Sequence, residues 1–481
     1  MLAISNIFYS SPAVKIDIQE SRLDFTLKQS AERLLDYVNS YKVYFTNGTK
    51  EVSKNAHAYV QGLFKSEKKK ATCTGMSEVL QNVRSQNLNH LLTGSPWCYK
   101  EVMTQVSSKS NKDLKNHPDT CLLLDDFSFA KKGEKSVGVA HQYLGCLGKK
   151  ANGQVVVGLT QNCGTHNSIV NARLYLPKCW TSNVTRMEQA GVPWEYQSFK
   201  TKPEIALDLI DESLKNGLHF NWLDMDSGYG RSLPLLRKLE NRDIIFVADI
   251  PADMQIYEQQ PILYIPAKKE GRGRPSTKLV TDSVRIEVRK FQEQLSPQDW
   301  RTIAVRDATK GDVLIQGYKT RIWVWDKDKT KTQSYILYIK KPLNYDDKIS
   351  YSLLNVADDL PLERIAFMQG QRFFVEHTYK EGKNQVGLGD AQVRSWQGLH
   401  KHLALCMMAL HFLMQCRMST QALGFKHFTA NDFKELICFL IPNKINSVEE
   451  LIERLKSKYR QYHKDIERNK RKSRKLFVQL E

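Results

Sequence analysis

The sequence lacks the features that mark membrane-spanning, secreted and disulfide-stabilised proteins. It contains no run of about 18 uncharged apolar residues, the length that a helix needs to cross a bilayer. Its N-terminal stretch has no basic segment ahead of a long apolar one, as a secretory signal would. The nine cysteines include no Cys-x-x-Cys pair, so we expect buried thiols rather than zinc ligands or disulfides. These absences predict a soluble, intracellular protein with no membrane partner.

Negative charge is also scarce, because 71 lysines and arginines outnumber 52 aspartates and glutamates and give a formal net charge of +19. Such a balance is typical of proteins that bind polyanions, although ribosomal and membrane-surface proteins share it. The 481 residues exceed one ordinary domain, and 41% apolar residues are enough for several cores.

Two acidic sites each follow an apolar segment. The run Cys121–Leu124 leads into Asp125 and Asp126, which predicts a central strand that carries an acid to the edge of a sheet. Asp224 and Asp226 alternate with apolar residues, so both face the same side of a second strand. A glycine-rich turn, a helical segment and another strand follow, an arrangement in which ligands gather at the carboxyl ends of strands.

A third site combines one carboxylate with three cations. Arg372, Glu376, Lys380 and Lys383 stand at offsets of four, four and three, which places them in one stripe of a helix. A carboxylate in this setting can hold a divalent metal while its neighbours bind phosphates. The alternative is a solvated helix face with ordinary salt pairs.

In order and spacing, these segments resemble bacterial insertion-sequence transposases that have an RNase H-like domain and an Asp-Asp-Glu triad, most closely the group called "IS seven-oh-one". The resemblance covers most of residues 60 to 420 and rests on segments such as LLLDDFSFAKKGEK, LDMDSGYG and VRSWQGLHKHLALCMMAL. The family signature around the glutamate has Tyr, Arg, Glu and Lys in that order. Arg372, Glu376 and Lys383 match it, whereas Gln369 stands at the Tyr position.

The resemblance implies a catalytic and metal-binding triad of Asp126, Asp226 and Glu376. The family motifs place the ligand at the second aspartate of the first pair, Asp126, and at the acid that directly precedes Ser227, Asp226, and they leave Asp125 and Asp224 as alternatives. The triad would bind two Mg²⁺ ions, with Mn²⁺ expected to substitute. One ion would activate water or the transposon 3′-OH, and the other would stabilise the departing oxygen.

We expect further residues to bind DNA. Arg372, Lys380 and Lys383 would clamp phosphates beside the metals. The segment Arg272–Pro275 reads Arg-Gly-Arg-Pro, the core of an AT-hook, in which Arg272 and Arg274 would enter a narrow A·T minor groove; a basic loop making phosphate contacts is the alternative.

Two aromatic residues lie in the β-rich interval before the glutamate. Trp323 and Trp325 share a strand face and could stack on an unpaired base, although burial in a local core is the competing interpretation.

We predict an α/β protein with an RNase H-like mixed sheet flanked by helices, interrupted by an all-β insertion and preceded by a helical domain. A hairpin turn is expected at residues 149–153. The expected domains are a helical DNA-binding domain at 1–115, the catalytic domain in two parts at 116–250 and 366–430, a mostly β insertion at 251–365, and a helical basic region at 431–481.

The resemblance implies a cut-and-paste DNA transposase that cleaves transposon ends and transfers the strands into target DNA. Its partners would be the double-stranded terminal inverted repeats and the target, and it would act as a homodimer in a synaptic complex in the bacterial cytoplasm, associated with the nucleoid. The alternatives are a catalytically inactive, domesticated DNA-binding protein and a stand-alone metal-dependent endonuclease.

Overall fold

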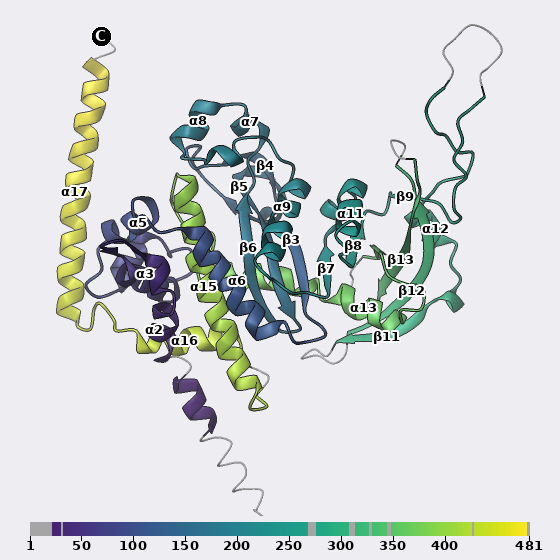
Figure 1. Cartoon of the computed structure of the whole chain (residues 1–481). Coiled ribbons are helices and arrows are strands. Elements are labelled where there is room, and N and C mark those ends of the chain that lie inside the picture. The colour runs from purple at the N-terminus through teal and green to yellow at the C-terminus, as the bar shows by residue number, and fades with distance from the viewer. Residues whose placement is uncertain are drawn as a thin grey trace, which may run out of the picture.

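One large mixed sheet organises the molecule (Figure 1). The computed structural model describes residues 22–29, 32–267, 276–306, 313–326, 330–343, 348–425 and 428–478. Its strands are β1 (Thr46–Asn47), β2 (Lys50–Glu51), β3 (Cys121–Ala130), β4 (Ala140–Leu144), β5 (Lys149–Cys163), β6 (His166–Leu174), β7 (Trp222–Met225), β8 (Phe246–Ile250), β9 (Gln255–Ile256), β10 (Ile286–Glu287), β11 (Arg301–Arg306), β12 (Val313–Val324), β13 (Gln333–Pro342) and β14 (Ser350–Leu354). Within the described ranges, ten of them form the sheet, in the order β11-β12-β13-β14-β8-β7-β3-β5-β4, with β6 also paired to β5.

Helices cover both faces of this sheet. In chain order they are α2 (Leu34–Asn39), α3 (Ser53–Lys65), α4 (Cys73–Val79), α5 (Ser85–Thr93), α6 (Tyr99–Leu114), α7 (Lys178–Thr181), α8 (Val184–Gln189), α9 (Lys202–Lys215), α10 (Ser227–Gly230), α11 (Leu233–Glu240), α12 (Val288–Glu293), α13 (Leu362–Gly370), α14 (Phe373–Gln385), α15 (Trp396–Gln421), α16 (Ala430–Leu440) and α17 (Val448–Val478). The mixed sheet flanked by helices agrees with the predicted fold class.

Strand β3 is central because its side chains are buried on both faces. It runs parallel to β7 and antiparallel to β5. Leu122 and Leu124 join the hydrophobic cluster that contains α9 and α11, whereas Leu123 and Phe127 join the cluster that contains α15. The alternation of a strand therefore assigns successive residues of β3 to opposite layers.

The strands between residues 301 and 354 extend the central sheet instead of forming a separate one. β14 pairs antiparallel with β8, with Ser352 opposite Asp249, and β13, β12 and β11 continue outward from it. The region is rich in strands, as predicted, and also contains α12. The prediction of a nested all-β domain is not confirmed, because backbone hydrogen bonds between β14 and β8 join these strands to the central sheet.

The hairpin turn lies earlier than predicted. The chain reverses through a 3₁₀ turn at Gly145–Leu147, followed by Gly148 at φ 62°, and residues 149–153 already belong to β5. A positive φ is accessible to glycine without strain, so the Gly-Cys-Leu-Gly segment makes the turn. The prediction of a turn at the Lys-Lys-Ala-Asn-Gly segment, residues 149–153, is therefore wrong.

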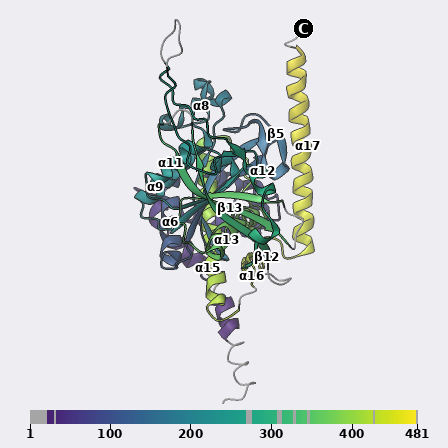
Figure 2. The ribbon, with the colours of Figure 1, turned by 90° about the vertical axis from the view of Figure 1, so that its right-hand side faces the viewer.

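Residues 34–114 are mostly helical and share one hydrophobic cluster with α15 and α16. Leu63 and Leu91, from α3 and α5, and Leu405, from α15, are fully buried in that cluster. Figures 1 and 2 show that α17 instead stands apart from the rest of the molecule. In the described part of the chain, no helix has both the length and the apolar character of a membrane span.

Candidate active site

The register of the sheet separates the two adjacent aspartates of β3. Leu123 pairs with Asp224 in the parallel neighbour β7, so Asp125 lies on the same face as Asp224 and Asp226. Asp126 points to the opposite face. The face of Asp125 is the one covered by α14, because Leu123 and Phe127 of β3 share a cluster with Val375 and Tyr379 of α14.

Helix α14 carries the predicted cationic stripe to this face. Arg372, at its N-cap, and Glu376, Lys380 and Lys383 all line a cavity of about 530 Å³ together with Asp125, Asp126 and Asp226. The predicted acids and cations are therefore brought together at one place. Asp126 reaches the cavity as well, so cavity lining alone does not choose between the two β3 aspartates.

A glycine allows α14 to lie close to the sheet. Gly158 stands opposite Asp125 in β5, and a Cβ atom there would be 2.7 Å from Tyr379 Oη and 2.8 Å from a ring carbon of Phe127. The Tyr379 hydroxyl uses this space to donate a hydrogen bond of 3.3 Å to the Asp125 carbonyl. This contact fixes α14 against the strand that carries Asp125.

Arg372 connects the acids of this face. Its Nε donates to Asp249 Oδ2 at 3.1 Å, and its terminal nitrogens lie 3.5 Å from Asp125 Oδ2 and 3.4 Å from Glu376 Oε1. Burial acts to lower the pKa of Arg372, but the surrounding carboxylates, led by Asp249 and Asp125, raise it above its usual value. A single guanidinium thus serves several carboxylates.

Negative charge on this face exceeds what Arg372 neutralises. Burial raises the pKa of Asp125 to about 7, with Asp226 adding to the rise and Arg372 opposing it. Burial also raises the pKa of Asp226, although its carboxylate accepts hydrogen bonds from the Gly228 and Tyr229 amides at 3.0 and 3.2 Å. Both carboxylates would be stabilised by an added cation.

The donor set fits a hard divalent cation, which prefers carboxylate oxygen. Among the residues that the structure describes, no three acidic, histidine or cysteine side chains are already grouped closely enough to hold a metal ion. Glu376 accounts for part of this, because its side chain is 70% exposed and follows α14 rather than the sheet. The two buried aspartates supply a fixed pair of ligand groups, and Glu376 supplies a carboxylate with freedom to turn.

Asp126 has partners of its own on the other face. Lys202, in the first turn of α9, forms an ion pair with its Oδ2, and the Tyr229 hydroxyl donates to its Oδ1 at 2.5 Å. Thr201 and Glu204 form a capping box that sets the start of α9 and so positions Lys202. The Asp126 carboxylate therefore joins α9 and α10 to β3.

Asp224 lies beneath the cavity and is only 1% exposed. Burial, with a further contribution from Asp249, raises its pKa well above the usual value. It does not line the cavity that holds Asp125, Asp226 and Glu376. Asp224 lies within β7 and Asp226 directly follows that strand, and of the two only Asp226 lines the cavity.

Several residues that contact the site acids were not predicted from the sequence. Asp249 is the next-to-last residue of the apolar strand β8, as Asp226 directly follows β7, so an acid near the end of an apolar strand could have identified it. Ser352 Oγ donates to Asp249 Oδ1 at 2.6 Å, a contact between distant segments that the sequence does not indicate. Lys202 and Tyr229 likewise come from other elements.

The other predicted DNA contacts are not part of this cavity. Trp323 lies in β12, across β13, β14, β8 and β7 from β3, and Trp325 follows that strand; neither lines the cavity. Arg272 and Arg274 lie outside the described residues. Lys383, in contrast, lines the cavity, and burial lowers its pKa.

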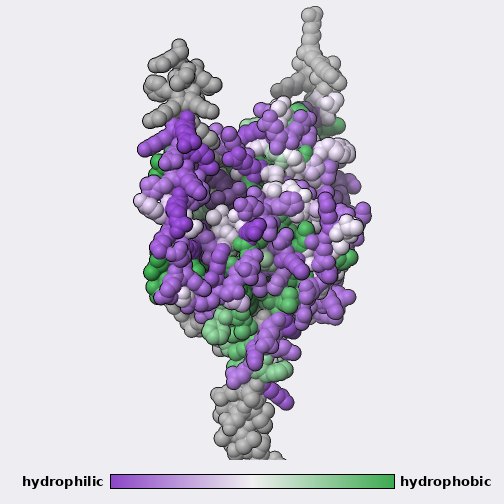
Figure 3. Space-filling model, turned by 90° about the vertical axis from the view of Figure 1, so that its left-hand side faces the viewer, coloured by the Kyte–Doolittle hydropathy of each residue, from purple (hydrophilic) through white to green (hydrophobic). Residues whose placement is uncertain are grey.

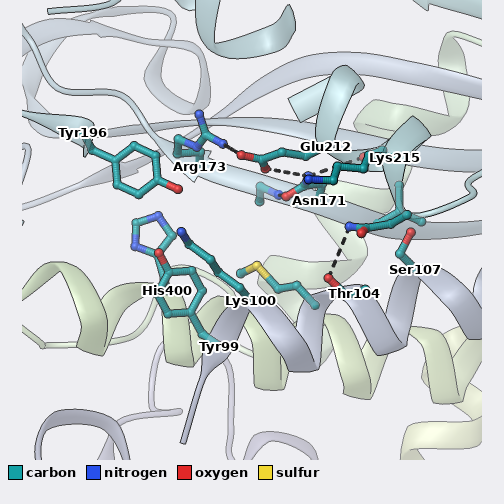
Figure 4. A pocket seen from close by; sticks show the side chains of 15 residues that line it. Tyr99, Lys100, Thr104, Ser107, Asn171, Arg173, Tyr196, Glu212, Lys215 and His400 are labelled. Atoms are coloured by element: carbon teal, nitrogen blue, oxygen red, sulfur yellow. Dashed lines mark hydrogen bonds and ion pairs between the residues drawn. The ribbon is translucent and has the colours of Figure 1, made fainter. Parts of the chain in front are cut away.

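A second cavity, of about 280 Å³, lies between α6, β6, α9 and α15 and is shown in Figure 4. Its arginine is already neutralised, because Arg173 pairs with Asp208 at 2.9 Å and with Glu212 and stacks over Tyr196. None of the predicted triad acids lines it. The second cavity has Glu212 as its single lining carboxylate, whereas four carboxylates line the cavity at α14.

Comparison with known proteins identifies the family of this chain. The model of the family described as DDE superfamily endonuclease matches residues 44–312, more than half of the chain. A probable transposase for insertion sequence element IS701 from Microchaete diplosiphon is 25% identical over 329 residues, which are 68% of this chain and 73% of that protein.

Two solved structures are more distant. The piggyBac transposase in a synaptic complex with hairpin DNA aligns with 90% of this chain and 81% of its own at 11% identity and a TM-score of 0.40. The NurA nuclease from Sulfolobus solfataricus aligns with 56% of this chain and 83% of its own at 8% identity and a TM-score of 0.24. On the family match, which confirms the resemblance seen in the sequence, this chain belongs to the DDE superfamily of endonucleases.

Proposed function

We propose that this protein is a DNA transposase that cleaves the ends of its element and joins them to target DNA. Membership of the DDE superfamily and the likeness to the IS701 transposase support this function. The observation that carries it is the cavity at α14, where Asp125, Asp226 and Glu376 lie beside three cationic side chains. Carboxylates and cations in one cavity suit a reaction at a phosphodiester.

For the first acid of the triad we propose Asp125. It shares a sheet face with Asp226 and with helix α14, and it shares the single guanidinium of Arg372 with Asp249 and Glu376. Asp126, the choice made from the family motif, is bound to Lys202 and Tyr229. Its assignment stays a prediction, which separate exchanges of Asp125 and Asp126 for asparagine would test.

Asp125, Asp226 and Glu376 would hold the divalent ions that DDE endonucleases generally use. We propose Mg²⁺, in two sites, with Mn²⁺ as a substitute; when bound, these ions activate an oxygen nucleophile and stabilise the leaving oxygen. Lys380 and Lys383 would orient the scissile phosphate by charge. Arg372, fixed by Asp249, would hold the carboxylates in position before the ions bind.

DNA is the partner that the family and the net charge of +19 support. We propose that the terminal inverted repeats and the target DNA contact the helical region before residue 115 and the basic residues Arg272 and Arg274. The aromatic pair Trp323 and Trp325 would stack on an unpaired base. The RNase H-like character of the sheet, the homodimeric synaptic complex and action in the bacterial cytoplasm belong to the same proposal.

The test measures cleavage and binding on one preparation of each variant. Asp226→Ala and Glu376→Ala should abolish Mg²⁺-dependent cleavage of a duplex that carries the element's end, yet bind that duplex nearly as well as wild type, because affinity depends mainly on cations. Glu188→Ala, which removes an exposed carboxylate outside the cavity, is the control for loss of negative charge. Cleavage that survives in both acid variants would contradict the proposed function.

A further inference from the structure

The C-terminal helix α17 spans Val448–Val478 and has few ties to the body of its own chain. Its first turn is capped by Ser447, whose hydroxyl accepts from the Glu450 amide at 3.2 Å. An ion pair of 2.7 Å joins Arg454 to Glu78 of α4. Figures 1 and 2 show the helix rising beside the molecule, so most of its surface faces outward.

One side of α17 exposes large apolar residues at regular intervals. In sequence order this stripe, named the α17 stripe, consists of Val448, Ile452, Leu455, Tyr459, Tyr462 and Ile466, and Leu451 is exposed beside its first turn. The first five are 45–66% exposed, and Ile466 is half-buried. In Figure 3, the column that α17 forms is mostly hydrophilic, with small hydrophobic areas at its edge.

The spacing of the α17 stripe indicates what it packs against. Its intervals are four, three, four, three and four residues, the a and d positions of a heptad repeat. A helix that rests on a globular core usually has a broader apolar face, whereas a strict a/d stripe is the narrow seam of a coiled coil. The stripe therefore requires another helix, and in the described part of this chain no helix covers it, since its side chains remain exposed.

The charges of α17 indicate the direction of that second helix. Glu449, Glu450 and Glu453 mark its start, whereas six lysines and arginines lie between Arg468 and Lys475. Two copies in parallel would place the two basic ends together, whereas an antiparallel pair keeps them apart. The charges of α17 therefore favour the antiparallel direction.

We propose that α17 is a dimerisation helix that forms an antiparallel coiled coil with α17 of a second copy of this chain. With the pair centred on Ser457, Val448 lies against the partner's Ile466, Ile452 against the partner's Tyr462, and Leu455 against the partner's Tyr459. Every core layer then joins an a position to a d position, as antiparallel packing requires, and every layer is apolar. The basic ends beyond Ile466 project in opposite directions.

The α17 pair would form the dimer proposed above for the transposase, and only the role of that dimer in transposition rests on the proposed function. The pairing itself requires neither metal nor DNA. It is therefore measured on the full chain without either, so a failure here is distinguishable from a failure of cleavage.

Analytical ultracentrifugation of the full chain tests the proposal. Wild type should sediment as a dimer at micromolar concentration, and the double variant Ile452→Asp with Leu455→Asp as a monomer, because buried unpaired carboxylates are unfavourable. Ser457→Asp, on the opposite side of the helix, introduces the same charge and should stay dimeric. A monomeric wild type, or a double variant that remains a dimer with an unchanged near-ultraviolet circular dichroism spectrum, would overturn it.

Cysteine cross-linking tests the direction. When Leu455→Cys and Tyr459→Cys chains are mixed and oxidised, an antiparallel pair should give mostly the mixed disulfide. Wild type treated in the same way controls for the exposed native thiols Cys98, Cys146 and Cys179. Efficient cross-linking of Leu455→Cys chains to one another, without mixed product, would show a parallel pair and reject the antiparallel arrangement.

Discussion

The two faces of β3 show how neighbouring residues of the same type acquire different chemistry. On one face, Asp125 shares Arg372 with Asp249 and Glu376 and lies near a second buried carboxylate, Asp226. On the other face, Asp126 has its own lysine and a tyrosine hydroxyl. Excess negative charge marks a place that can accept a cation, whereas balanced charge marks a structural contact. The number of partners per carboxylate therefore distinguishes the two aspartates.

Exchanging the carboxylates for amides is the strongest test of this difference. Asp125→Asn should reduce metal-dependent cleavage by about a thousandfold or more, since a bound metal contributes several kcal/mol and each 1.36 kcal/mol is tenfold in rate. Asp126→Asn should cost about tenfold or less, through a looser α9. Single-turnover cleavage rates measure both, and the reverse order would establish Asp126, the choice made from the sequence, as the first acid.

Lys383 tests whether the cations on the Asp125 face act on substrate. Lys383→Ala should slow cleavage by about a hundredfold through lost positioning of the phosphate, with little change in the Mg²⁺ concentration required. Lys383→Arg should recover part of the rate, because it restores the charge with a different shape. Full activity of the alanine variant would mean that the stripe on α14 is only a solvated helix face.

Gly158 tests the closeness of α14 to β3. Gly158→Ala should lower the free energy of unfolding by about 2 kcal/mol, because the new methyl group would collide with Tyr379 and Phe127. Gly145→Ala is the matched control, since a Cβ atom there has no neighbour within 4 Å. Urea denaturation measures both, and equal stability of the two variants would argue against tight packing at Gly158.

The pH dependence of metal binding should show the smallest effect. The pKa of Asp125 is raised to about 7, so its proton persists to higher pH than in an ordinary aspartate and competes with the metal. Affinity should therefore rise as pH increases, by about tenfold from pH 6 to pH 8, and level off above pH 8. Mn²⁺ titration calorimetry would detect this, and the same slope in Asp125→Asn would assign the proton elsewhere.

The sequence predicts most of the candidate residues of the site, but not which of two adjacent acids faces α14. Asp226 and Glu376 were predicted from the family motifs and from local patterns, a strand followed by glycines and a helical stripe, and both line the cavity. The choice between Asp125 and Asp126 depends on which face α14 covers, and alternation alone cannot reveal that. Asp249 joins the site through Ser352 and Arg372, which lie more than 100 residues away. The pairing of β14 with β8 is equally distant and was missed for the same reason.

That pairing limits how the protein can be shortened. A fragment that omits residues 251–365 would leave β8 as an edge strand with unpaired backbone groups, which invites aggregation. It would also remove Ser352 from Asp249 and so loosen the carboxylate that holds Arg372. A truncated protein made to isolate the catalytic sheet would therefore lose both its solubility and the arrangement of its acids.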